Sequence, residues 1–120
     1  MVIKLADNKP TIIQNMKGGK KYVQKYDSAT KDTFTDNADI VARLVLIPGA
    51  SLGYHEHVGN EETITVISGK AKVIDDGTEY ILGPGDVTIC REHHKHSIEN
   101  VSEDEDLVIV IAVIKVPQAV

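Results

Sequence analysis

The sequence GASLGYHEHVGNEETITVISG, residues 49–69, places two histidines one residue apart and two adjacent glutamates shortly after them. Successive side chains of a β-strand point to opposite faces of a sheet, so His55 and His57 project the same way. Two imidazoles at this spacing can bind one metal ion, although a pair of exposed or core-packed histidines has the same pattern. The residues that follow favour the metal.

The two glutamates differ in the face of the strand that they occupy. A turn over residues 58–60 would bring a second strand alongside the first, with one glutamate facing the imidazoles. Glu62 has the parity of Ile64 and Val66, which predicts that it points inward, where an unpartnered carboxylate is costly and a metal ligand is not. Glu61 has the opposite parity and is expected to be a solvated charge or a neighbour of the ligands that moves protons.

The rest of the composition favours a chain built from β-strands. Valine and isoleucine supply 28 of the 120 residues, and these β-branched side chains pack well on sheets and are penalised in helices. Ser68-Gly69 and Asp76-Gly77 predict short hairpins, the second compatible with a type I′ turn. The predicted fold class is all-β, with strands over residues 40–47, 51–57, 62–67, 71–74, 79–82, 87–89, 96–100 and 107–116.

The length of the chain predicts one domain over residues 1–120. Residues 40–116 are expected to form a core barrel, on which residues 1–39 pack as strands and loops, with residues 22–26 compatible with an edge strand. The last strand, residues 107–116, is apolar on both faces, which predicts burial on both sides. We expect its second face to lie in the interface of a homodimer, although the N-terminal segment could also cover it.

Charge, hydropathy and cysteine content argue against several classes of partner. The net charge is −5 and no long basic run is present, so no nucleic-acid partner is expected. No apolar run approaches the roughly 20 residues that span a bilayer, and the first residues lack the apolar core of a signal peptide, so no membrane association is expected. Cys90 is a lone cysteine, expected to be a small buried hydrophobe, and a chain without an internal disulfide favours a cytoplasmic location.

The spacing of these residues resembles that of the cupin superfamily. The first cupin motif is matched at every fixed position by Gly49-x5-His55-x-His57-x4-Glu62-x6-Gly69. The second motif is recognisable in Pro84-Gly85-Asp86 followed by His96-x3-Asn100. One detail differs, because Gly77 precedes Pro84 by one residue more than the usual pattern has. The resemblance covers the central half of the chain, and it implies a double-stranded β-helix, which is a jelly-roll barrel.

The resemblance also implies one divalent metal ion inside the barrel. Carried over residue by residue, the ligands are His55, His57, Glu62 and His96. Three imidazoles and one carboxylate suit Mn, Fe, Ni, Cu or Zn, because these ions accept nitrogen ligands more readily than Ca or Mg do. His93 and His94 fall in the loop before the last ligand and are expected at the rim or surface, where one could shuttle protons.

The function that this resemblance implies is metal-dependent chemistry on a small polar molecule. An octahedral ion with four protein ligands keeps two positions for a carboxylate, keto or enol substrate or for dioxygen. Dioxygenase, decarboxylase, isomerase and lyase reactions all stay open, because fold analogy does not choose among them. Arg43 could bind a substrate carboxylate if it points inward, or face solvent or a second subunit if it does not. The alternative function is a non-catalytic cupin that binds or senses a small molecule.

Overall fold

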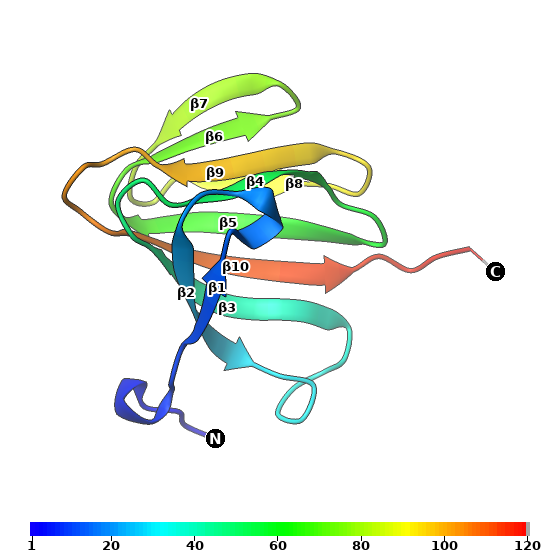
Figure 1. The fold of residues 1–120 in the computed structure, drawn as a ribbon. Helices are drawn as coiled ribbons and strands as arrows, with labels where there is room; N and C mark the ends of the chain where they lie inside the picture. The colour runs from blue at the N-terminus through cyan, green and yellow to red at the C-terminus, as the bar shows by residue number, and fades with distance from the viewer. Residues whose placement is uncertain (120) are drawn as a thin grey trace.

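The computed structural model describes residues 1–119, so Val120, the last residue of the predicted domain, lies outside the described residues. This part of the chain contains no α-helix and forms ten strands in two antiparallel sheets, as the sequence predicts (Figure 1). Two 3-10 turns, η1 (Leu5–Asp7) and η2 (Met16–Gly18), lie near the N-terminus. Among residues 1–119 we find no helix with the length and hydropathy needed to cross a membrane.

Each sheet mixes strands that are distant in sequence. The larger sheet has the order β1 (Thr11–Gln14), β2 (Tyr22–Ala29), β3 (Ala38–Leu46), β10 (Leu107–Lys115), β5 (Asn60–Ser68) and β8 (Val87–Cys90). The smaller sheet has the order β4 (Ser51–Glu56), β9 (Lys95–Asn100), β6 (Ala71–Asp75) and β7 (Thr78–Leu82). All eight strands expected between residues 40 and 116 are present, and the predicted jelly-roll barrel is confirmed.

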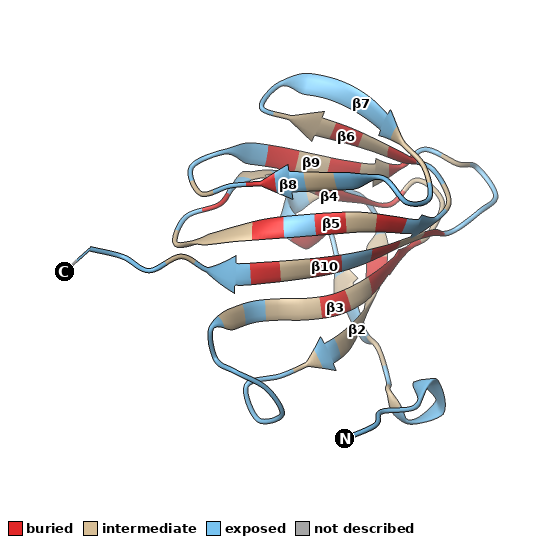
Figure 2. Cartoon of the chain, turned by 180° about the vertical axis from the view of Figure 1, so that it is seen from behind, coloured by how far each residue is buried: buried red, intermediate tan, exposed pale blue. Residues whose placement is uncertain are grey.

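The core lies between the two sheets and follows the alternation of the strands. Figure 2 shows buried and more exposed residues alternating along β5 and β10. Ile64 and Val66 of β5 meet Ile109 and Ile111 of β10 in this core, each about 1% exposed or less. Glu62 lies on the same inward face as Ile64, which confirms the parity argument.

The N-terminal strands correct one expectation. Residues 22–26 are compatible with an edge strand in the sequence, but they belong to β2, which extends to Ala29 and lies between β1 and β3. The edge is β1, which pairs with β2 through Ile13 opposite Val23. Because β1 has only four residues, it is too short for an alternating pattern to indicate it.

Of the three tight turns that the sequence predicts, one forms a hairpin within a sheet and two connect the two sheets. Asp76 and Gly77 have φ of 46° and 85° and join β6 to β7, so the predicted type I′ hairpin is confirmed. The hairpins expected at residues 58–60 and at Ser68-Gly69 are wrong, because each turn carries the chain from one sheet to the other. A turn-forming glycine reverses the chain but does not decide which strand edge accepts the next strand.

Candidate metal centre

Four side chains from both sheets converge inside the barrel. His55 lies on β4, His57 follows it, Glu62 lies on β5 and His96 on β9. We call this group the His3Glu cluster; one ligand atom from each member lies within 4.8 Å of the others. The His96 Nε2 atom is 3.0 Å from both the His57 Nε2 atom and the Glu62 Oε1 atom. The four residues that the resemblance singles out are therefore neighbours in space.

An extra residue in β4 aims the histidines at this point. Leu52 pairs with Ile98 and His55 pairs with His96, so three steps on β4 match two on β9, which is the signature of a β-bulge. Leu52 faces the core, and strict alternation from it would turn His55 outward. The bulge at residues 53–54 restores the inward direction for His55 and leaves Tyr54 exposed.

The outer ring nitrogens of two histidines are held by the protein. The Nδ1–H group of His55 donates to the Gly53 carbonyl oxygen at 2.7 Å. The Nδ1–H group of His57 donates to the Asn60 Oδ1 atom at 2.6 Å. Since each Nδ1 atom carries the proton in these bonds, the Nε2 atoms point toward the centre of the cluster as metal ligands require.

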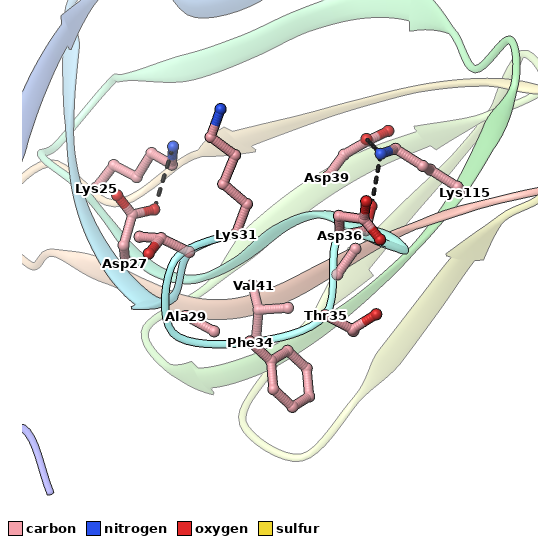
Figure 3. Close-up of a pocket in the computed structure, with 12 residues that line it drawn as sticks. Lys25, Asp27, Ala29, Lys31, Phe34, Thr35, Asp36, Asp39, Val41 and Lys115 are labelled. Carbon is pink, nitrogen blue, oxygen red and sulfur yellow. Dashed lines mark hydrogen bonds and ion pairs between the residues drawn. The ribbon is translucent and has the colours of Figure 1, made fainter. Parts of the chain in front are cut away.

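A chain of polar contacts continues from Asn60 to the surface. The Asn60 amide nitrogen donates to the Asp39 Oδ2 atom at 3.0 Å, and the Asp39 Oδ1 atom is 3.8 Å from the Lys115 ammonium nitrogen. Asp39 lies at a register shift between β3 and β10, where Ala38 and Ile40 pair with successive residues of β10. Asp39 and Lys115 also line a cavity of about 310 Å³ on the far side of this chain of contacts from the cluster, and Figure 3 shows both side chains there. Asp39 lines this cavity and also the separate cavity that opens onto the His3Glu cluster, described below.

The electrostatics of the cluster fit a divalent cation. Burial of the Glu62 carboxyl raises its pKa, but hydrogen bonds from His57 and His96 outweigh burial and lower that pKa to about 2. Burial lowers the pKa of His55, whereas the hydrogen bond to Glu62 raises that of His57. An ionised carboxylate that is only 3% exposed beside three imidazoles is a donor set suited to Mn, Fe, Ni, Cu or Zn.

A cavity of about 370 Å³ opens onto the cluster. Its apolar wall includes Leu52, Ile111 and Val113, and its polar lining includes residues that sequence reasoning missed: Lys17, Asp39, Glu56 and Asn60. Asn60 lies inside the first motif, but nothing in the spacing indicates its contact with His57. Lys17 and Asp39 are distant in sequence from the motif, so only the tertiary structure brings them to the cavity.

Two other predicted site residues lie away from this cavity. Glu61 is half-buried and has the parity opposite to Glu62, so it does not line the cavity. The Arg43 guanidinium carbon lies 4.1 Å from the centroid of the Tyr26 ring, and Arg43 pairs with the outward-facing Val110. Alternation along β3 and β5 places both side chains outside the barrel, and neither contacts the His3Glu cluster.

The remaining titratable residues of the sequence analysis lie outside the His3Glu cluster. His93 and His94 are exposed, as expected; the His94 Nδ1 atom is 2.5 Å from an Asp76 carboxylate oxygen. Cys90 is buried, as expected for a small hydrophobe, and burial raises the pKa of its thiol to about 11. A thiol with a raised pKa is a poor nucleophile and a poor metal ligand.

Two facing antiparallel sheets with three imidazoles and a carboxylate between them define a small jelly-roll barrel with a candidate metal centre. A family model described as the cupin domain matches residues 42–113, and the chain belongs to this family. The match spans the barrel from β3 to β10 and includes every member of the His3Glu cluster.

Relatives share both sequence and fold. The chain is 34% identical over 100 residues to the oxalate-binding protein of Thermotoga maritima, and the match covers 83% of each chain. A solved structure of a predicted oxalate decarboxylase from Thermotoga maritima has 32% identity and a TM-score of 0.90, covering 97% of this chain and all of that one (100%). KdgF from Halomonas has a TM-score of 0.76 at 18% identity, covering 97% and 94%, which supports the fold alone.

Proposed function

We propose that this cupin binds one divalent transition metal ion through the His3Glu cluster and binds a small carboxylate at that ion for catalysis. The convergence of the four ligand atoms within 4.8 Å of one another carries this proposal. The names of the two Thermotoga matches, oxalate-binding protein and predicted oxalate decarboxylase, support a carboxylate as the ligand.

The residues of the chain have separate tasks in this proposal. When bound, the ion supplies a Lewis acid that polarises a substrate oxygen. His55, His57, Glu62 and His96 hold it, while the apolar wall of the cavity limits the access of water. Glu56 lines the cavity with its carboxylate 3.8 Å from the His93 Nδ1 atom, so this pair can hold and pass a proton at the rim.

Decarboxylation is the reaction that we favour for a substrate such as hydrogen oxalate. Its carbon–carbon bond breaks, carbon dioxide leaves, and the electron pair left on the other carbon takes a proton to give formate. The atoms and charge balance without an external reductant or oxidant. Binding without turnover is the second candidate, since the curated match from Thermotoga maritima has the name of a binding protein.

Metal analysis followed by a turnover assay tests this function. We expect the wild-type protein to hold close to one equivalent of Mn, Fe, Ni, Cu or Zn, and His57→Ala to lose most of it, because a buried ligand is removed. His94→Ala is the matched control and keeps the metal, since His94 is exposed and outside the cluster. A wild-type protein that takes up none of these ions contradicts the proposal.

Turnover then separates the two candidates. Incubation of the metal-loaded protein with ¹³C-labelled oxalate should give labelled formate and carbon dioxide in the NMR spectrum. Oxalate that binds in calorimetry and is recovered unchanged supports the binding protein instead. A loaded protein that neither binds nor converts oxalate argues against this carboxylate under both candidates.

A homodimer is the assembly that we propose, through the outer face of the larger sheet. Three neighbouring strands, β10, β5 and β8, present exposed apolar side chains there, and Figure 2 shows them side by side. Val110 is 39% exposed and Ile89 is 58% exposed, and no described N-terminal segment covers the outer face of β10. Exposed apolar side chains gathered on one face of a sheet are typical of a protein–protein interface. We call it the outer patch, and its exposed members are Ile67, Val87, Ile89, Val110 and Ile114.

A further inference from the structure

The turn before β2 brings a lysine to the candidate metal centre. Lys17, in η2, lines the same 370 Å³ cavity as His55, His57 and Glu62, and it is the one ammonium group among the described residues of that lining. Within residues 1–119, Lys17 forms no ion pair, whereas the neighbouring Lys20 pairs with a glutamate on β9.

The turn contains two residues in the left-handed backbone region, which asparagine adopts readily and lysine rarely. Asn15 and Lys17 have φ of 50° and 54°, in the left-handed region that disfavours residues with a Cβ atom. The Asn15 side-chain amide donates to the Gly19 carbonyl oxygen at 3.0 Å, and the Gly18 N–H group donates to the Asn15 carbonyl oxygen at 2.9 Å. Such strain persists where surrounding contacts determine it, and it often marks a functional position.

Close backbone packing against β4 supplies these contacts. A Cβ atom built on Gly53 would lie 2.2 Å from the Lys17 carbonyl oxygen, so only glycine allows this approach. The Lys20 N–H group donates to the Ser51 hydroxyl at 2.9 Å, and the Ser51 N–H group donates to the Lys20 carbonyl oxygen at 3.0 Å. The same stretch of β4 carries the bulge that aims His55 inward, so the turn and the cluster are positioned together.

We propose that Lys17 binds the second carboxylate of a small dicarboxylate whose first carboxylate lies at the metal, so that the cavity selects dicarboxylates over monocarboxylates. This inference rests on the proposed function and assigns the substrate class of that site. The carboxylates of the lining do not compete for Lys17, because Asp39 accepts from Asn60, Glu56 lies near His93 and Glu62 belongs to the cluster. An ammonium–carboxylate hydrogen bond is stronger than a neutral one, which makes it an effective selector.

Calorimetry with Mn(II)-loaded protein tests the selection, because binding is measured and not turnover. The titrants are oxalate, malonate and acetate, and the proteins are the wild type, Lys17→Met, Lys17→Arg and Lys20→Met. We expect Lys17→Met to weaken the binding of oxalate and malonate by about tenfold or more, the factor expected from one charge-assisted hydrogen bond, while acetate binding changes less than about twofold. Lys17→Arg should restore most of the dicarboxylate affinity, and Lys20→Met, altered in the same turn but outside the cavity, should bind like the wild type.

Three results would overturn the inference. In the first, Lys17→Met binds oxalate as tightly as the wild type does. In the second, it loses oxalate and acetate binding to the same extent, which indicates a general disturbance of the site. The manganese content of each variant, measured with every titration, distinguishes this second result from a simple loss of the metal ion. In the third, loaded wild-type protein binds none of the three anions, which refutes the proposed function and the role of Lys17 with it.

Discussion

His57 is held at both of its ring nitrogens, and this makes Asn60 a positioning residue. Its Nε2 atom faces the His3Glu cluster, and its Nδ1–H group donates to Asn60, which in turn donates to Asp39. A hydrogen bond at the far nitrogen fixes the tautomer and the ring orientation, and it raises the basicity of the ligating nitrogen. The polar chain therefore holds the His57 ring in the orientation that a metal ligand needs.

Replacing Asn60 should weaken metal binding without unfolding the protein. We expect Asn60→Ala to lower the affinity for Zn(II) or Mn(II) by about 10- to 100-fold, because His57 loses the acceptor for its Nδ1–H group. Asn60→Asp keeps an acceptor for His57 but places a second carboxylate against Asp39, so we expect it to retain only part of the affinity. Competition with a chelating dye measures the affinity, and circular dichroism checks the fold. Asn8→Ala, which removes a side-chain hydrogen bond to Asp27 away from the cluster, is the control, and equal affinities for Asn60→Ala and the wild type would contradict this role.

Asn100 has a structural task, although it belongs to the second motif. Its side chain is 1% exposed and donates to the carbonyl oxygens of Leu46 and Glu105, at 2.9 and 2.8 Å. Its Oδ1 atom accepts from the Ser102 N–H group at 2.9 Å. One side chain thus joins β3 to the loop that precedes β10. These hydrogen bonds explain why this motif position is an asparagine with a structural role and is not a metal ligand.

At the scale of elements, the β-bulge in β4 determines the direction of His55 and the position at which η2 packs against β4. The bulge is placed at Gly53, where the backbone of the Lys17 turn comes too close for a side chain. The register shift at Asp39 in β3 has a comparable effect, because it brings a carboxylate within reach of Asn60. Irregularities in two strands therefore shape the site, while the regular parts of those strands form the core.

A methyl group at Gly53 should disturb this arrangement. We expect Gly53→Ala to lower the free energy of unfolding by roughly 1–3 kcal/mol, because the new Cβ atom would lie 2.2 Å from a backbone oxygen and the chain must shift. Gly83→Ala is the matched control: a Cβ atom there meets nothing within 4 Å, so its unfolding free energy should stay within about 1 kcal/mol of the wild type. Urea unfolding measures both, and equal stability of the two variants would argue against the close approach.

At the scale of the whole molecule, the two sheets differ in what their outer faces present. The outer patch of the larger sheet has apolar side chains on β5, β8 and β10, and the Arg43 guanidinium, which stacks on Tyr26, lies beside it opposite Val110. The smaller sheet carries Lys72 and Glu99 as an ion pair on its exterior. The contrast favours association through the larger sheet.

A charge in the outer patch should therefore separate the proposed dimer. We expect wild-type protein at micromolar concentration to have twice the mass of one chain in light scattering, and Val110→Lys to have the mass of one chain. Ile81→Lys is the control, because Ile81 is 55% exposed but lies on β7 of the other sheet. Its mass should equal that of the wild type, and a monomeric wild-type protein would refute the dimer.

Most of the barrel could be predicted because alternation is a local property of a strand. Periodicity indicated the eight strands after residue 40 and the inward direction of Glu62. The pairing of those strands was not local: the turns at residues 58–60 and 68–69 indicate chain reversal in the sequence, yet they join different sheets. The short strand β1 escaped prediction because four residues hold too little pattern.

The sequence by itself indicated the jelly-roll class and the four residues of the His3Glu cluster through its resemblance to the cupin motifs, because motif spacing is written along the chain. Only the tertiary structure decided what surrounds the cluster. Lys17 and Asp39 reach the cavity through a strained turn and a register shift, and Asn60 meets His57 through a turn that crosses between the sheets. These contacts depend on where distant backbones approach each other, and that approach is set by packing of the whole barrel, which no short stretch of sequence encodes.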